Sequence, residues 1–205
     1  MRESRAEAIR GLFRGPGIPV DALDDGLDWF GADSPSNGSG PLTPAAVLVP
    51  IVERGDAPTV LFTRRTDHLK SHSGQISFPG GRMEERDATP EATALRETRE
   101  EVGLSEGDIE VLGRLAVRET GTGYRVVPVV GMLAPPLSLV PDENEVAEIF
   151  EVPLDFLIDP ANRRFETRVR GNVERQFYAI PYEEYFIWGL TARILVNLGD
   201  LLTKR

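Results

Sequence analysis

Three glutamates near the middle of the chain have a spacing that could bring their carboxylates together. On an α-helix, Glu97, Glu100 and Glu101 fall within an arc of roughly 100°, while Leu95 and Val102 gather on the opposite side. Like charges three and four residues apart repel each other, whereas hard divalent cations such as Mg²⁺ need clustered carboxylate oxygens. The pattern therefore predicts either a metal site or a solvated acidic helix face.

Residues with strong positional preferences predict where this helix begins and ends. Pro90 suits the first helical position, Thr89 suits the N-cap, and Gly103 suits the position just after the last turn. Gly80 and Gly81 allow a tight turn before the acidic segment, with backbone carbonyls exposed. These glycines favour the metal site over the solvated face.

The segment 81–104 resembles the signature of the Nudix hydrolases, Gly-x5-Glu-x7-Arg-Glu-U-x-Glu-Glu-x-Gly-U, where U is a bulky apolar residue. Residues 96–104 match its last nine positions, except that Thr98 stands where U is expected. Asp87 occupies the first Glu position, but eight residues instead of seven separate it from Arg96, so its role stays open. The resemblance covers roughly residues 45–200. It implies an α/β fold (α+β), the Nudix-type α/β/α sandwich with a mixed central sheet.

The resemblance also implies a metal-dependent hydrolase of nucleoside diphosphate-linked substrates, with Mg²⁺ or Mn²⁺ as cofactor. The expected metal ligands are three glutamates and one glycine carbonyl: Glu97, Glu100, Glu101 and Gly81. Arg96 is expected to hold a carboxylate by ion pairing. Glu145 is the candidate for a further catalytic or metal-binding carboxylate, with Glu143 and Glu148 as rivals. The alternative for this later segment is a solvated acidic turn.

A narrower resemblance covers the segment just before the double glycine. Coenzyme A pyrophosphatases of the Nudix family carry Leu-Leu-Thr-x-Arg-(Ser/Ala)-x3-Arg-x3-Gly-x3-Phe-Pro-Gly-Gly, and residues 61–81 keep this spacing throughout. The departures are Phe62 for Leu, Thr66 for Ser or Ala, and Lys70 for Arg. The resemblance implies cleavage of coenzyme A or its thioesters to 3′,5′-ADP and (acyl-)4′-phosphopantetheine.

The same segment holds the densest group of cations near the acidic helix. Arg64, Arg65 and Lys70 are expected to bind substrate phosphates, although Lys70 lacks the planar fork of Arg; surface cations at a strand end are the alternative. Arg125 follows a glycine-rich loop that suits either a phosphate or a simple hairpin turn. The full set of expected substrate contacts is Arg64, Arg65, Lys70, Gly80, Gly81 and Arg125.

Composition limits the class of protein. The chain has 205 residues, 40% hydrophobic and 27% charged, which is ordinary for a soluble globular protein. A net charge of −10 argues against sequence-independent nucleic-acid binding, and the absence of cysteine excludes disulfides and zinc–thiolate sites. We see neither a signal-peptide pattern nor an apolar run long enough for a membrane span, so we expect a cytoplasmic protein that does not bind membranes.

Patterning along the chain predicts the elements that position these residues. Residues 2–14 suggest an amphipathic helix that docks on the body or on a second subunit, which makes a homodimer plausible. We divide the chain into an N-terminal helix and linker, 1–40, and a Nudix domain, 41–205. The expected strands are 45–52, 59–63, 75–78, 109–115, 126–130 and 150–154, followed by a hairpin over 165–180 and a closing helix over 185–202.

Two alternatives compete with a coenzyme A pyrophosphatase. One keeps the chemistry and changes the substrate to ADP-ribose, NADH or another nucleoside diphosphate derivative. The other is a non-catalytic nucleotide-binding module, which would be expected to have lost signature carboxylates. The three helix glutamates are all present here, which favours an enzyme.

Overall fold

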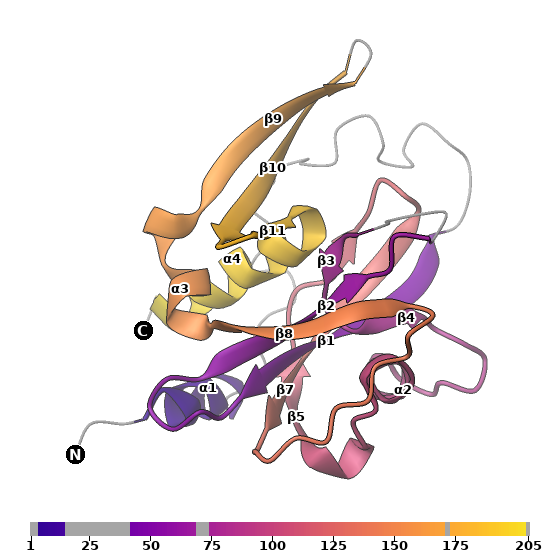
Figure 1. The fold of residues 1–205 in the computed structure, drawn as a ribbon, viewed down its shortest axis with the longest axis vertical. Helices are drawn as coiled ribbons and strands as arrows, with labels where there is room; N and C mark the ends of the chain where they lie inside the picture. The colour runs from indigo at the N-terminus through magenta and orange to yellow at the C-terminus, as the bar shows by residue number, and fades with distance from the viewer. Residues whose placement is uncertain (1–3, 15–41, 69–73, 171–172, 204–205) are drawn as a thin grey trace.

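The computed structural model describes residues 4–14, 42–68, 74–170 and 173–203, and its centre is a mixed sheet of eight strands (Figure 1). The strands are β1 (Thr43–Val52), β2 (Thr59–Arg65), β3 (Ile76–Ser77), β4 (Gly80–Arg82), β5 (Ile109–Arg114), β6 (Arg118–Glu119), β7 (Tyr124–Leu133) and β8 (Val146–Pro153). The main order is β3-β2-β1-β7-β5, with β4 paired to β1, β6 to β7 and β8 to β2. β1 and β7 run parallel along their whole length, whereas β1 pairs with β2 and β4 in the antiparallel sense.

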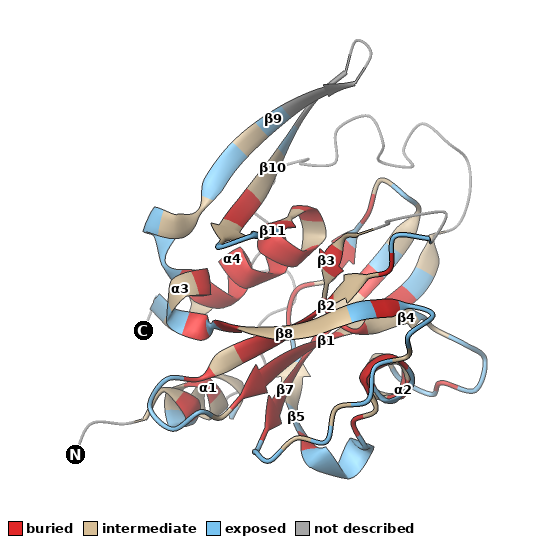
Figure 2. Cartoon of the chain, viewed as in Figure 1, coloured by how far each residue is buried: buried red, intermediate tan, exposed pale blue. Residues whose placement is uncertain are grey.

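Helices cover both faces of this sheet, as the sequence predicts. Ala46 and Leu48 of β1 belong to the core under α2 (Pro90–Val102). Val49 and Ile51 belong to a second core, shared with α1 (Arg5–Phe13) and α4 (Gly189–Thr203). Because side chains alternate along a strand, the apolar run of β1 can fill both cores, and it is buried along most of its length (Figure 2). The α/β/α sandwich is confirmed.

A smaller antiparallel sheet packs beside α4, on the side of the central sheet that α4 covers. It contains β9 (Arg164–Arg170), β10 (Val173–Tyr182) and β11 (Tyr185–Trp188). β9 and β10 form the hairpin expected over 165–180. The short helix α3 (Leu154–Ile158) and two turns of 3-10 helix, η3 (Glu106–Asp108) and η4 (Pro160–Asn162), complete the described elements.

The closing helix begins later than the sequence predicts. Residues 185–188 form β11, which pairs with β10, and α4 begins only at Gly189, whose φ is 64°. Ile187 is fully buried in this strand. A buried apolar residue at this position is compatible with the helical period of the residues that follow as well as with a strand. Periodicity alone cannot separate the two over four residues.

The N-terminal helix docks on the body of its own chain. Ser4 caps α1 by accepting a hydrogen bond from the N–H of Glu7, and Ile9 is fully buried in the core that α4 covers. The division of the chain near residue 41 and the linker over 34–40 lie outside the described residues and stay predictions. Within the described part of the chain, no helix is long and apolar enough to cross a membrane.

Candidate active site

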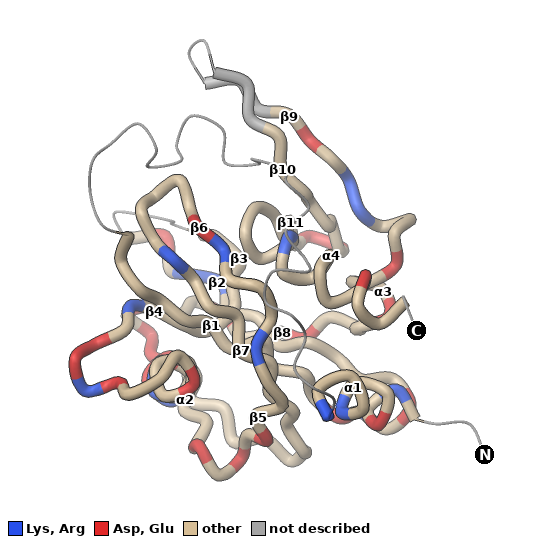
Figure 3. Tube along the Cα trace, turned by 180° about the vertical axis from the view of Figure 1, so that it is seen from behind, with Lys and Arg blue, Asp and Glu red and all other residues tan. Residues whose placement is uncertain are grey.

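Helix α2, which carries the three glutamates, begins and ends where the sequence predicts. The Thr89 hydroxyl oxygen accepts a hydrogen bond from the N–H of Ala92. Gly103 has a φ of 78°, in the left-handed region that glycine adopts without strain, and its N–H bonds back to the last turn. Figure 3 shows acidic residues on this helix and on the loop before it. Local capping therefore fixes where the helix begins and ends.

Arg96 lies at the centre of the site, with acidic partners on both sides. Its Nε and Nη2 donate to Asp87 at 3.1 and 2.9 Å. Its Nη1 donates to Glu97 at 2.8 Å and to Glu100 at 2.9 Å, and its Nη2 also donates to the carbonyl of Arg82 at 2.9 Å. The guanidinium, although almost fully buried, thus connects the loop before α2 with two of the helix glutamates.

Asp87, whose role the sequence left open, is the buried partner of Arg96. Besides the guanidinium, it accepts hydrogen bonds from the N–H of Glu84 at 2.9 Å and from the hydroxyl of Thr93 at 3.1 Å. The hydrogen bonds from Arg96 are the main reason that the pKa of Asp87 lies well below its usual range. The extra residue between Asp87 and Arg96 is accommodated without loss of this ion pair. Asp87 therefore positions Arg96.

Glu101 is a buried carboxylate beside other carboxylates. Its exposed fraction is 5%. Burial raises the pKa of Glu101 to about 8; the charges of Glu97 and Glu145 act in the same direction, and Arg65 acts against them. Burial also raises the pKa of Glu97. A carboxylate in such surroundings is stabilised by a proton or by a cation.

The loop before β8 is fixed so that Glu145 approaches the helix glutamates. The N–H of Thr66 donates to the carbonyl of Glu145 at 3.0 Å, and the N–H of Asp142 donates to the carbonyl of Glu101 at 3.0 Å. The charge of Glu145 raises the pKa of both Glu97 and Glu101. Of the three carboxylates weighed in this segment, the structure thus brings Glu145 to the site.

The double glycine lets the backbone of β4 pass close to two neighbours. A Cβ on Gly81 would lie 2.5 Å from Cδ of Glu97, and a Cβ on Gly80 would lie 2.5 Å from the carbonyl oxygen of Ala46. Both glycines pair with β1, at Ala46 and Val47. The absence of side chains here leaves room for the Glu97 carboxylate against the Gly81 backbone.

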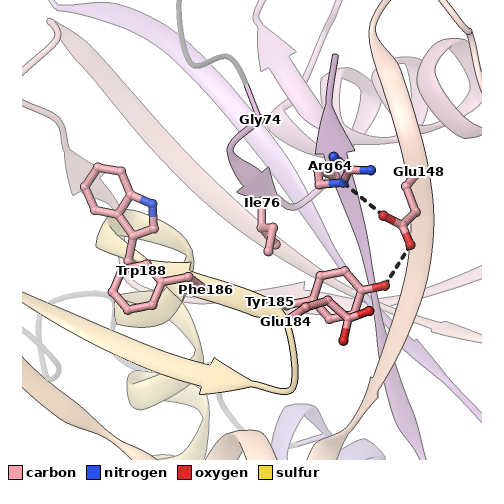
Figure 4. A pocket seen from close by; sticks show the side chains of 8 residues that line it. All are labelled: Arg64, Gly74, Ile76, Glu148, Glu184, Tyr185, Phe186 and Trp188. Carbon is pink, nitrogen blue, oxygen red and sulfur yellow. Dashed lines mark hydrogen bonds and ion pairs between the residues drawn. The ribbon is translucent and has the colours of Figure 1, made fainter. Parts of the chain in front are cut away.

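Arg64 and Arg65 have different partners although they are adjacent. A register shift in the pairing of β2 with β8 falls between them. Arg65 lies 3.5 Å from a carboxylate oxygen of Glu145, while Nε of Arg64 donates to Glu148 at 2.9 Å. Glu148 also accepts from the hydroxyl of Tyr185 at 2.7 Å (Figure 4). Arg65 therefore belongs to the carboxylate site, and Arg64 to the region beside β11.

The other two expected cations are not brought to the glutamates by any described contact. Lys70 lies outside the described residues. Arg125 is exposed near the start of β7, across from Glu119 of β6. The loop before it is a hairpin turn, in which Gly123 has a φ of 86° and its N–H donates to the carbonyl of Thr120 at 3.0 Å. Of the two alternatives predicted for this loop, a phosphate site or a hairpin turn, its backbone conformation is that of the hairpin turn.

The donor chemistry of the site suits a hard divalent cation. Carboxylate oxygens of Glu97, Glu100 and Glu101 and the nearby backbone of Gly81 are ligands that Mg²⁺ and Mn²⁺ prefer. Among the residues that the structure describes, no group of three His, Asp or Glu side chains stands close enough to bind one ion together. Arg96 takes one oxygen each of Glu97 and Glu100. Binding of a cation by several carboxylates would thus require these side chains to turn.

Comparison with known proteins identifies the family to which this chain belongs. A family model described as the NUDIX domain matches residues 42–170. The chain is 42% identical over 156 residues to the Nudix hydrolase NudL of Yersinia enterocolitica (76% of this chain, 80% of the relative). It is 44% identical over 156 residues to NudL of Photorhabdus laumondii (76% and 83%). A crystal structure of the Nudix hydrolase RenU from M. smegmatis aligns with a TM-score of 0.49 at 27% identity (58% of this chain, 77% of that chain).

Proposed function

We propose that this protein, which belongs to the Nudix hydrolase family, cleaves the diphosphate of coenzyme A or its thioesters to 3′,5′-ADP and (acyl-)4′-phosphopantetheine. The observation that carries the chemistry is the buried carboxylate of Glu101 beside Glu97 and Glu145. The choice of substrate is supported by the resemblance of residues 61–81 to the coenzyme A pyrophosphatase pattern.

The glutamates of α2 would hold Mg²⁺ or Mn²⁺, with Gly81 contributing its carbonyl. When bound, such a cation neutralises phosphoryl oxygens and promotes ionisation of water. Arg96, which bonds one oxygen each of Glu97 and Glu100, would keep both side chains near the site while they turn toward the cation. Burial disfavours the charged form of Glu101, so a bound cation that compensates this charge would be favourable at this position.

Residues around the cation would accept the proton of the attacking water and stabilise the charge on the diphosphate. A water molecule attacks phosphorus in line, the bond from phosphorus to the bridging oxygen breaks, and the leaving phosphate takes that electron pair. Glu145 is our candidate to accept the proton of the attacking water, and Arg65, beside it, is placed to stabilise negative charge on the diphosphate. Lys70 and Arg125 stay proposed substrate contacts; Lys70, which lies outside the described residues, rests on the sequence pattern of residues 61–81.

A substrate panel tests the proposal. The purified protein is assayed with Mg²⁺ or Mn²⁺ against coenzyme A, acetyl-coenzyme A, ADP-ribose and NADH, with products identified by mass spectrometry and EDTA as the metal-free control. We expect coenzyme A or its thioester to have the highest kcat/KM and EDTA to abolish turnover. If ADP-ribose or NADH is preferred, the chemistry stands and the substrate assignment fails.

A variant separates an enzyme from a binding module. Glu101→Gln should lower kcat by several orders of magnitude, because it removes the buried charge that holds the cation. It should not unfold the chain, since burial disfavours the charged form of Glu101. Near-normal turnover in Glu101→Gln would overturn the assignment of the site, and no turnover of any substrate by the unmodified protein would favour a non-catalytic module.

Cytoplasmic location and a homodimer stay predictions. The apolar side of α1, which made a dimer plausible, packs on the body of its own chain through Ala6 and Ile9.

A further inference from the structure

Both carboxylate oxygens of Glu100, the most exposed of the three helix glutamates, accept hydrogen bonds from arginines. Nη1 of Arg96 donates to one oxygen at 2.9 Å, and Nη2 of Arg86 donates to the other at 3.3 Å. Arg86 lies on the loop between β4 and α2, which carries charges of both signs (Figure 3). A divalent cation that binds Glu100 therefore meets an arginine at either oxygen.

The two arginines are held with very different strength. Arg96 is almost fully buried, and its guanidinium also donates to the buried carboxylate of Asp87 at 2.9 Å. The side chain of Arg86 is 61% exposed, and its second partner, Glu84 at 2.7 Å, is half exposed. Removing a partner from a buried ion pair is costly, whereas an exposed pair contributes little. Of the two arginines on Glu100, Arg86 is the one that a competitor can displace.

The backbone beside Arg86 is fixed even though its side chain is exposed. The N–H of Asp87 donates to the carbonyl of Glu84 at 2.9 Å, and the N–H of Glu84 donates to the Asp87 carboxylate at 2.9 Å. These two bonds close the turn that carries Arg86. Because Glu84 belongs to the same turn and pairs with Arg86, a guanidinium that leaves Glu100 keeps one partner and stays beside the site.

Electrostatic repulsion opposes a cation and Arg86 at the same carboxylate. Mg²⁺ binds oxygen at about 2.1 Å, so an ion on the oxygen that Arg86 occupies would lie less than about 6 Å from the guanidinium nitrogen. That separation is shorter than the Debye length of about 8 Å at physiological ionic strength, so salt screens the repulsion only in part. Release of Arg86 from Glu100 removes most of it.

We propose that Arg86 occupies the place of the divalent cation at Glu100 and is displaced from this carboxylate when the cation binds. The proposal rests on the proposed function, because it takes Glu100 to be a ligand of the metal. Arg86 is then a built-in competitor, which lowers the affinity of the site for the metal, and Glu84 retains the displaced side chain at the edge of the site.

Direct measurement of metal binding tests the competition without catalysis. The full chain, freed of metal by chelation, is titrated with Mn²⁺ in the absence of substrate, and electron paramagnetic resonance reports the concentration of free ion. We expect Arg86→Gln to bind Mn²⁺ about threefold to tenfold more tightly than the unmodified protein, because a nearby positive charge and a hydrogen bond to Glu100 are both removed. Unchanged or weaker binding would overturn the proposal.

Two further variants separate displacement from a general effect of charge. Arg99→Gln removes one positive charge from an exposed position of α2 beside Glu100 in the sequence, and no ion pair of Arg99 occurs among the residues that the structure describes. It should change Mn²⁺ affinity less than about twofold. Arg86→Lys keeps the charge and should stay closer to the unmodified protein than Arg86→Gln does.

The pattern across these variants decides the result. Equal tightening by Arg86→Gln and Arg99→Gln would assign the effect to net charge and overturn the displacement. Equal tightening by Arg86→Lys and Arg86→Gln would do the same, because the charge at position 86 would then not oppose the cation. Thermal unfolding in EDTA checks that the variants fold, as expected for substitutions at exposed positions.

Hydrolysis measured on the same proteins keeps the two proposals apart. Equal Mn²⁺ affinity of Arg86→Gln and the unmodified protein, with metal-dependent turnover intact, overturns the displacement and leaves the hydrolase. Tighter Mn²⁺ binding by Arg86→Gln without turnover of any substrate supports the displacement and overturns the proposed reaction. Absence of Mn²⁺ binding in both proteins overturns both proposals.

Discussion

A single buried side chain, Arg96, connects the acidic loop before α2 with two of the helix glutamates. Its exposed fraction is 6%, and it bonds to Asp87, Glu97 and Glu100. Removing one partner of a buried pair leaves an uncompensated charge, which usually costs about 3–5 kcal/mol. At the scale of the residue, the Asp87–Arg96 pair is therefore a stability determinant as well as a support for the site.

Asp87→Asn tests this pair at nearly constant volume. We expect it to lower the free energy of unfolding by about 2–4 kcal/mol, because Arg96 loses its buried counter-charge. Urea unfolding at neutral pH measures the change. Asp56→Asn, at an exposed position in the β1–β2 turn, is the control and should change stability by less than about 0.5 kcal/mol. Equal effects at both positions would contradict the role of Asp87.

Among the elements, β4 and α2 approach each other through a glycine backbone. A side chain on Gly81 would meet the flexible end of Glu97, whereas one on Gly80 would meet the backbone of β1 at Ala46. The Glu97 side chain can move aside, whereas the backbone of β1 cannot. The two glycines therefore serve different purposes, room for a carboxylate and close strand pairing.

The alanine pair Gly81→Ala and Gly80→Ala should separate these purposes. Gly81→Ala should reduce kcat at least tenfold with a small change in stability, because it displaces the Glu97 carboxylate. Gly80→Ala should destabilise the protein by about 1–3 kcal/mol, because β1 must shift. Thermal unfolding and steady-state kinetics measured on both variants decide the matter, and identical behaviour would refute the distinction.

Helix α2 is also tied to β5 by one ion pair. Arg114 donates to both carboxylate oxygens of Glu91, at 2.6 and 2.7 Å. These hydrogen bonds lower the pKa of Glu91 to about 2. Because the folded pKa lies below the unfolded one, the pair stabilises the fold above about pH 4.5, and this contribution is lost as the pH falls toward 2.

Glu91→Gln should therefore show a pH-dependent loss of stability. We expect a decrease of about 1–2 kcal/mol at pH 7, reduced for partial exposure and salt screening. The difference from the unmodified protein should shrink as the pH is lowered from 4.5 to 3. Urea unfolding at several pH values measures it; a difference that does not change with pH would exclude the ion pair as its source.

In the whole molecule, the central sheet separates two hydrophobic cores that have different roles. The core under α2 supports the carboxylates, while the core under α1 and α4 closes the opposite face. Ile9 of α1 is fully buried in the latter. The N-terminal helix is thus part of the packed body, and its loss should affect stability more than chemistry.

Ile9→Ala measures this contribution. We expect a loss of about 2–4 kcal/mol in unfolding free energy, the usual cost of such a truncation in a core. The kcat of the folded protein should stay unchanged, because α1 lies on the face away from α2. Val111→Ala, at a 37% exposed position on β5, is the control. A marginal effect of Ile9→Ala would mean that α1 docks loosely.

The sequence alone determined the bounds of α2, the sandwich fold and the family. Capping residues and a 3.6-residue period act over one or two turns, so they are visible in a single stretch of chain. Even Thr98, which departs from the signature, is satisfied locally, because its buried hydroxyl donates to the carbonyl of Ala94 at 2.6 Å. The start of α4 was missed for the opposite reason, since β11 exists through its pairing with β10.

The tertiary structure decided which side chains meet. Asp87 became the partner of Arg96 because the loop folds back on α2. The loop that carries Glu145 is held at the site by backbone bonds to Thr66, just after β2, and to Glu101 of α2. A shift in strand register gave Arg64 and Arg65 different partners. These placements depend on pairings between residues far apart in the chain, which local propensity does not encode. The sequence thus specified the acidic helix, and the contacts around it specified the site.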